Sequence, residues 1–234
     1  MAVYVMSDVH GLYDKFMKMI QLLDLKEEDH VYFLGDVIDR GNDGIKILQY
    51  IFDHPQFTLL MGNHEYMMLQ TLDASKGSID INMEYIQWFM NGAETTVHQF
   101  LELSTIEQQE IHKRLKALPI AITDLKVNDR SFYLVHGCCS ELEKEGTLYL
   151  DDVNDVLPFL WQRVEPKTIK MRKKILVAGH TMTTYYHDTY TIYHSHRKIQ
   201  RSKYIDIDCG CSHNNEACQF AALRLDDFQE FYVK

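Results

Sequence analysis

The sequence lacks several features that mark particular classes of protein. It has only four prolines and no Pro/Ser-rich linker or low-complexity segment, so its composition does not divide the 234 residues into separate units. No run of roughly eighteen apolar residues is present, which argues against a transmembrane helix. The N-terminus lacks a basic segment followed by a long apolar region and does not resemble a signal peptide. We therefore expect a single domain over residues 1–234 and a cytoplasmic location.

Cysteine and positive charge are also scarce. Five cysteines are an odd number, which argues against a disulfide framework in a chain without a signal sequence. Cys209, Cys211 and Cys218 match no common zinc-binding spacing and are interpreted as buried or loop thiols. Acidic residues outnumber basic ones by 34 to 24, giving a net charge of −10. This balance argues against a general nucleic-acid-binding protein, although bound metal ions could still attract an anionic substrate.

The first part of the chain alternates short apolar runs with amphipathic segments. Residues 2–6, 31–34 and 57–61 are apolar runs of strand length. Residues 12–24 carry apolar side chains at helical spacing, and a second amphipathic helix is expected before Pro55. This alternation predicts a parallel sheet with right-handed crossovers and helices on both faces.

The remainder of the chain is helical at first and then rich in strands. Residues from about 65 to 118 are predicted to form a helical insertion that covers the cleft, with a capping signal beginning at Ser104. A further helical segment is expected over 151–163. Strands are expected at 120–127, 131–135, 175–178, 188–194, 203–208, 217–225 and 228–233. The C-terminal half should therefore supply a second, more antiparallel sheet, making an α/β fold of two sheets flanked by helices.

Polar side chains follow the apolar runs where the predicted strands end. Ligands bind at the carboxyl ends of strands in such sheets. Any one of these residues alone is typical of a turn, a helix cap or a satisfied histidine, but a series at successive strand ends is not. The set comprises two carboxylates, three imidazoles and one amide, namely Asp8, His10, Asp36, Asn63, His136 and His180.

Two metal ions account for this set better than one ion does. Six such ligands would crowd a single ion, whereas two ions can share a bridging Asp and fill their remaining positions with water. Oxygen and imidazole ligands suit Mn, Fe or Zn rather than thiol-preferring metals. Paired ions about 3.5–4 Å apart suit in-line displacement at phosphorus. The sequence therefore predicts two divalent ions, with Mn first and Fe or Zn as alternatives.

The motifs resemble the signature blocks of the phosphoprotein phosphatase family of metallophosphoesterases. The blocks are Ser-Asp-Val-His-Gly at 7–11, Gly-Asp-Val-Ile-Asp-Arg-Gly at 35–41, Gly-Asn-His-Glu at 62–65, His-Gly at 136–137 and Gly-His-Thr at 179–181. They occur in the family's order over residues from about 3 to 210. The compact length is similar to the bacterial and phage branch, which includes serine/threonine phosphatases and symmetrical dinucleoside tetraphosphatases. The resemblance implies a calcineurin-like two-sheet sandwich.

The resemblance also implies a division of the metal ligands. Asp8 and His10 match ligands of the first ion, and Asp36 matches both a ligand of that ion and the bridge. The remaining ligands of the second ion would be Asn63, His136 and His180.

Further residues match catalytic positions of the family. His64 resembles the general acid that protonates the leaving oxygen, with Asp39 holding and polarising its ring. Arg40 matches a phosphate-binding arginine, and Arg163 is similar to a second such arginine in bacterial members. Glu65 is expected to support the loop or begin the next helix rather than to bind metal.

The predicted activity is hydrolysis of phosphomonoesters by direct attack of a metal-bridging hydroxide. The first hypothesis is a serine/threonine protein phosphatase, acting on a phosphorylated protein or a small phosphoester. The second is a symmetrical dinucleoside tetraphosphate hydrolase, and the third is an inactive phosphoprotein-binding module, against which all six ligand positions argue. No nucleic-acid or membrane partner is expected.

Two positions bear on the choice of substrate. Met61 stands where protein phosphatases usually carry an arginine, so we expect the site to have one fixed cation fewer for the phosphate. This weakens the assignment to phosphoserine and phosphothreonine, and the tetraphosphatase relatives also lack that arginine. Those relatives more often carry Asp at the position of Glu65, however, so the two signals conflict.

Overall fold

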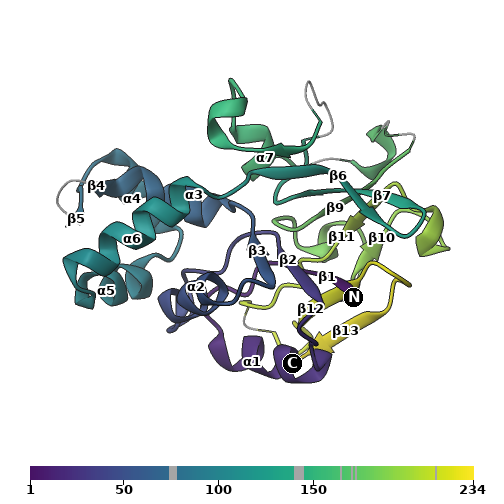
Figure 1. Ribbon diagram of the computed structural model, residues 1–234, viewed down its shortest axis with the longest axis horizontal. Coiled ribbons are helices and arrows are strands. Elements are labelled where there is room, and N and C mark those ends of the chain that lie inside the picture. The colour runs from purple at the N-terminus through teal and green to yellow at the C-terminus, as the bar shows by residue number, and fades with distance from the viewer. Residues whose placement is uncertain (74–77, 140–144, 164, 170, 172, 214) are drawn as a thin grey trace.

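The first of two central sheets carries the N-terminal strands (Figure 1). The computed structural model describes all residues except 74–77, 140–144, 164, 170, 172 and 214. The first sheet has the strand order β13 (Glu230–Val233), β12 (Phe220–Arg224), β1 (Val3–Met6), β2 (His30–Phe33) and β3 (Phe57–Leu59). Strands β1, β2 and β3 are parallel, as predicted, whereas β12 and β13 join them in antiparallel fashion.

The second sheet is mixed and, as expected, is the more antiparallel of the two. In the described residues three of its five strand pairings are antiparallel, against two of four in the first sheet. Its order is β10 (Tyr193–His194), β11 (Tyr204–Asp206), β9 (Ile175–Ala178), β7 (Arg130–Val135), β6 (Ala121–Val127) and β8 (Thr147–Leu148). Strands β7, β9 and β11 run parallel to one another, and β6, β8 and β10 pair antiparallel. The expectation that all the C-terminal strands form this sheet was wrong, because β12 and β13 return to the first sheet.

The two sheets pack face to face, so helices do not cover both faces of the first sheet as expected. Alternate residues of β1 point to opposite sides. Val5 packs with Leu134 and Val177 of the second sheet in one apolar cluster. Met6 packs with Phe16 of α1 in the other cluster. Helices α1 (Tyr13–Leu23) and α2 (Gly44–Asp53) therefore cover only the outer face of the first sheet (Figure 1).

The described residues of the predicted helical insertion form four helices. They lie beside β3 (Figure 1). They are α3 (Asn63–Thr71), α4 (Met83–Met90), α5 (Glu94–Glu102) and α6 (Thr105–Lys116), with a short hairpin of β4 (Leu72–Asp73) and β5 (Ser78–Ile79) after α3. The capping signal is present, because Ser104 Oγ accepts a hydrogen bond from Glu107 N–H and the Glu107 carboxylate accepts one from Ser104 N–H. No helix in the described residues, within this insertion or outside it, is long and apolar enough to span a bilayer.

Two regions between the strands of the second sheet differ from expectation. The helix predicted over 151–163 is limited to one 3₁₀ turn and the short helix α7 (Leu157–Trp161). The strand predicted over 188–194 is limited to its last two residues, because the backbone of residues 188–191 forms successive bends and only Tyr193 and His194 pair with β11. The 3₁₀ turns are η1 (Leu150–Asp152), η2 (Pro166–Thr168), η3 (Thr183–Tyr185) and η4 (Ile199–Arg201).

Candidate active site

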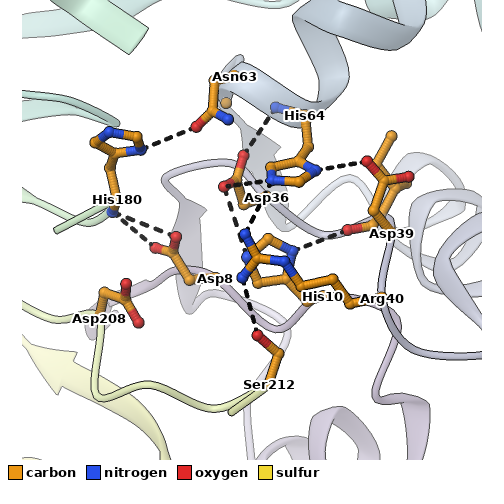
Figure 2. Close-up of polar contacts among 12 residues, drawn as sticks. Asp8, His10, Asp36, Asp39, Arg40, Asn63, His64, His180, Asp208 and Ser212 are labelled. Carbon is orange, nitrogen blue, oxygen red and sulfur yellow. Dashed lines mark hydrogen bonds and ion pairs between the residues drawn. The ribbon is translucent and has the colours of Figure 1, made fainter. Parts of the chain in front are cut away.

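Loops that follow five strands meet at one edge of the sandwich and bring the six predicted metal-binding side chains together. Five of them, all except His136, are labelled in Figure 2. The loops follow β1, β2, β3, β7 and β9. Five of the six side chains are at most 5% exposed, and His180 is half-buried. Asn63 begins α3, so its side chain lies at a helix N-terminus rather than in an extended loop.

One group of ligand atoms surrounds Asn63. Its Oδ1 atom lies 2.9 Å from Nε2 of His136 and 2.9 Å from Nδ1 of His180. The ligand atoms of Asp36, His136 and His180 all lie within 4.8 Å of one another. Nδ1 of His136 contacts the carbonyl oxygen of Leu34 at 2.8 Å, which directs the other ring nitrogen toward the site. This group can hold one divalent cation.

A second group surrounds His10 and shares Asp36 with the first. The ligand atoms of His10, Asp36 and His64 lie within 4.8 Å of one another. Nδ1 of His10 contacts the carbonyl oxygen of Ile38 at 3.1 Å, and its Nε2 lies 3.6 Å from Oδ2 of Asp36. The Asp8 carboxylate accepts the backbone N–H of His180 at 3.1 Å. Among the described residues, Asp36 is therefore the carboxylate that the two groups share.

The loops that carry these side chains have unusual backbone conformations. Left-handed φ angles occur at Asp8, His10, Asp36, Asp39, Arg40 and His180. Such conformations are costly for residues other than glycine and persist only when the surrounding structure enforces them. Where the loop after β3 approaches the loop after β2, a Cβ on Gly62 would lie 2.3 Å from Oδ1 of Asp36. Glycine is therefore required at that position.

Glu65 ties two of these loops together, as its expected supporting role requires. Its side chain is fully buried. Its Oε2 accepts hydrogen bonds from the N–H groups of Asp36 at 2.7 Å and Gly62 at 3.1 Å, and Oε1 accepts one from Val37 at 2.9 Å. Burial and the charge of Asp36 raise the pKa of Glu65 to about 7. The carboxylate holds the loop after β2 against the start of α3.

Beside the metal ligands lies a cluster of three side chains that contact one another, His64, Asp39 and Arg40 (Figure 2). Nδ1 of His64 donates to Oδ2 of Asp39 at 2.5 Å, and both side chains are buried. Nε2 of His64 lies 3.2 Å from an Nη atom of Arg40 and 3.8 Å from Asp36. Burial lowers the pKa of His64, but Asp36 and the hydrogen bond to Asp39 outweigh burial, so this pKa is raised. Arg40 also donates to the hydroxyl of Ser212 at 3.1 Å.

The histidines of the site have different pKa values because their surroundings differ. Burial lowers the pKa of His136, but the charge of Asp36 outweighs it and raises this pKa to about 10. Burial and the positive charge of His136 lower the pKa of His180 to about 3. Burial and the charge of His64 hold the pKa of His10 well below its usual range. The three imidazoles thus occupy different electrostatic environments within one site.

Three carboxyl groups are concentrated and buried in the site. Burial raises the pKa of Asp8 to about 6, and burial with the charge of Asp8 raises the pKa of Asp208 to about 8. Burial also opposes ionisation of Asp36, but His136 and His64 hold its pKa well below the usual range. Divalent cations would stabilise all three carboxylates in their charged form. The donor set of oxygens and imidazoles therefore fits two such ions.

Asp208 is a site residue that the sequence reasoning missed. It follows β11 just as the predicted ligands follow their strands, so the same strand-end signal could have found it. Its side chain is 9% exposed and lines the same cavity as Asp8.

The cavity above the ligands has a volume of about 700 Å³. Arg40 and Arg163 both line it, so the structure brings Arg163 to the site. Trp161 and Tyr185 contribute aromatic side chains to its wall. Met61 does not line the cavity, because its side chain is fully buried in the apolar cluster that contains the helices. Met61 supplies no cation to the cavity, and its effect on phosphate binding stays a prediction.

The chain belongs to the calcineurin-like phosphoesterase family, which matches residues 1–213. The resemblance to phosphoprotein phosphatases drawn from the motifs is confirmed by the relatives and by the fold. Serine/threonine-protein phosphatase 2 of Escherichia coli is 30% identical over 109 residues, which are 46% of this chain and 44% of that protein. The symmetrical bis(5'-nucleosyl)-tetraphosphatase of Legionella pneumophila (strain Corby) is 35% identical over 71 residues, which are 30% of this chain and 26% of that protein.

The fold is similar to that of solved phosphatases. A protein serine/threonine phosphatase from Saccharomyces cerevisiae superposes with a TM-score of 0.59 at 12% identity, over 100% of this chain and 79% of the other. At that identity the similarity shows the fold alone, and it confirms the predicted two-sheet calcineurin-like architecture. The curated relatives match over less than half of their own length, so the match places this chain in a metallophosphoesterase family without assigning its substrate.

Proposed function

We propose that this protein is a dinuclear-metal phosphoesterase that removes phosphate from serine and threonine side chains of proteins. The observation that carries the proposal is the position of His64. This buried imidazole donates to Asp39 through Nδ1 and presents Nε2 at the cavity wall, beside Asp36 and Arg40. A proton donor, a cationic phosphate-binding group and a set of metal ligands are thereby adjacent.

The six predicted ligands would hold the two ions, with Asp36 shared between them. Asp8 and His10 would complete the first site, and the second would use the three remaining side chains, Asn63, His136 and His180. When bound, two divalent ions neutralise phosphoryl oxygens and lower the pKa of a water so that it can attack phosphorus. Mn is the ion we propose for both positions, with Fe or Zn as alternatives.

The proposed role of His64 is to protonate the leaving oxygen from Nε2. Its raised pKa favours the charged form that can donate this proton. Asp39 fixes the ring through Nδ1 and stabilises its positive charge. A charged His64 and Arg40 would both present donors across the 3.2 Å that separates them, so the Arg40 guanidinium would turn toward the phosphate at that stage.

Arg40 and Arg163 are proposed to bind the phosphoryl oxygens. Both line the cavity and both are exposed, so either guanidinium can reach a bound phosphate. Asn91 lines the same cavity and offers an amide for a further hydrogen bond. The single-domain organisation and the cytoplasmic location remain predictions beside this proposal.

The phosphoprotein hypothesis is supported by the bacterial protein phosphatase, which matches 46% of this chain. Tetraphosphatases match 30% and 43% of it, so the choice between the two substrates rests on an assay. The test is a comparison of two substrates with Mn present. A phosphoserine or phosphothreonine peptide should release phosphate with the higher kcat/KM. A preference of more than a hundredfold for diadenosine tetraphosphate, with ADP as the product, would overturn the proposal.

A second candidate function is hydrolysis of dinucleoside tetraphosphates, and one observation favours it. Trp161 and Tyr185 line the cavity, and the Tyr185 side chain is 61% exposed. Exposed aromatic rings can stack on nucleobases. If this candidate is correct, replacing Tyr185 with Ala should raise KM for diadenosine tetraphosphate more than KM for p-nitrophenyl phosphate, which has no nucleobase.

A further inference from the structure

Trp88, a residue of the helical insertion, contacts the side chain that holds His64. Its indole Nε1–H donates to Oδ2 of Asp39 at 2.7 Å. The same oxygen accepts the hydrogen bond from Nδ1 of His64 at 2.5 Å. Trp88 and Asp39 are both fully buried. The N–H groups of His64 and Trp88, which are 24 residues apart in sequence, therefore converge on one carboxylate oxygen.

The other oxygen of Asp39 does not fix the carboxylate. Oδ1 is buried and has no hydrogen-bond partner among the described residues. Rotation of a carboxylate about its terminal torsion is otherwise soft, so its orientation depends on the groups that bond to it. An indole N–H can donate but cannot accept or lose its proton near neutral pH, so the direction of its hydrogen bond is invariant. Trp88 thus gives Asp39 a second donor of fixed direction, on the same oxygen that His64 contacts.

The insertion also holds the backbone of this loop. Asp39 and Arg40 have left-handed φ angles of 71° and 65°. Asp39 N–H donates to Oγ1 of Thr96 at 2.9 Å, and Arg40 N–H donates to the carbonyl oxygen of Gly92 at 2.8 Å. Strained backbone of this kind needs support from its surroundings. The turn after α4 and the first turns of α5 supply that support.

We propose that Trp88 is a positioning residue for proton transfer, acting on His64 through Asp39. The helical insertion is then part of the catalytic apparatus and does more than cover the cavity. This inference rests on the proposed function, in which His64 is the general acid. Its physical basis is that loss of the indole donor lets the Asp39 carboxylate rotate, so that the His64 ring is held less well at the angle needed to reach the leaving oxygen.

A buried tryptophan also needs a partner for its N–H, so a purely structural role for Trp88 is the competing explanation. The two explanations differ in how the decrease in kcat on removal of the indole N–H depends on the leaving group of the substrate. p-Nitrophenolate leaves readily without a proton, whereas the phenolate of phenyl phosphate depends on protonation. A positioning role for proton donation predicts unequal losses on these two substrates, and a structural role predicts equal losses.

The experiment compares Trp88→Phe with wild type on both substrates in the presence of Mn. Removing one hydrogen bond to a charged group should lower kcat for phenyl phosphate by about tenfold. The kcat for p-nitrophenyl phosphate should fall by less than about threefold, and KM and bound metal should not change. Phe100→Leu is the matched control, because Phe100 is also fully buried in the insertion and its hydrocarbon side chain has no group that can donate a hydrogen bond to Asp39. Any decrease in kcat that Phe100→Leu causes should be the same factor for both substrates.

A double variant removes the remaining ambiguity about folding. If Trp88 acts through His64, then Trp88→Phe should change kcat for phenyl phosphate by less than about twofold in a His64→Asn background. An equal loss in both backgrounds, or equal losses on the two substrates, would overturn the inference about Trp88. The proposed function fails separately, if His64→Asn alone shows no greater loss on phenyl phosphate than on p-nitrophenyl phosphate.

Discussion

The carboxylate of Glu65 accepts the backbone N–H of Asp36 at 2.7 Å, which joins the helix after β3 to the loop that carries the shared ligand. The same carboxylate accepts two further backbone N–H groups, those of Val37 and Gly62, and it is fully buried. Side chains of this kind do not touch the substrate. They determine whether the ligand loops keep the spacing that two metal ions need.

Replacing Glu65 with Gln should destabilise the protein. The amide would place an NH₂ donor against backbone N–H donors, leaving buried groups without partners. We expect a loss of about 1–3 kcal/mol in the free energy of unfolding, measured by denaturant titration. Glu107→Gln is the matched control, because Glu107 also accepts the N–H of the residue that caps its helix but is exposed. An equal loss in the two variants would contradict the bridging role of Glu65.

Replacing His64 with Asn should separate catalysis from metal binding. General acid catalysis contributes roughly 10²–10⁴-fold to the rate, so turnover of phenyl phosphate should fall by at least about a hundredfold. Metal content, measured by elemental analysis, should stay near that of wild type. Nε2 of His64 lies in one group of ligand atoms with His10 and Asp36. Loss of an ion in this variant would therefore identify His64 as a ligand and refute its assignment as the acid.

Replacing Asp36 with Asn should impair both metal positions, because this side chain belongs to both groups of ligand atoms. We expect fewer than one ion bound per chain after Mn addition, since the shared position loses its charge. Asp8→Asn serves as the comparison, and it should leave the position formed by Asn63, His136 and His180 filled. The prediction is wrong if Asp36→Asn still binds two ions.

Replacing Gly62 with Ala should disturb the site without any conflict in backbone conformation. Gly62 has a φ of −93°, which any residue adopts, but its Cβ would lie 2.3 Å from Oδ1 of Asp36. We expect a stability loss of about 1–3 kcal/mol and reduced metal binding. Gly146→Ala is the control for metal binding, because a Cβ there meets nothing within 4 Å. Its positive φ strains alanine, so its stability should fall while its metal affinity stays unchanged. Unchanged metal affinity in Gly62→Ala would show that the two loops can separate freely.

The strand-end pattern was sufficient to locate the candidate site from the sequence. Parallel strands place their carboxyl ends at one edge, so residues as distant as Asp8 and His180 could be predicted to meet, and they do. The alternation of apolar residues in the last two strands could not show which sheet they join, because both sheets offer an apolar inner face. It also could not reveal the direction of the Met61 side chain, which depends on tertiary packing.

The contact between Trp88 and Asp39 was beyond sequence reasoning for a related reason. A tryptophan among apolar residues of an amphipathic helix is typical of a core position, and Trp88 is indeed buried. Its N–H partner lies 49 residues away on a different element, and no local pattern specifies such a pair. Asp208 differs, because it follows a strand as the predicted ligands do, and applying the same rule to β11 would have identified it.

Measurement of bound metal together with phosphoester hydrolysis tests the central claim most directly. The protein should be stripped of metal, supplied with Mn, and assayed for ions per chain and for turnover of p-nitrophenyl phosphate. The account predicts two ions per chain and hydrolysis that is lost when the metal is removed. A protein that binds no metal and leaves p-nitrophenyl phosphate intact would contradict it and would support an inactive phosphoprotein-binding module.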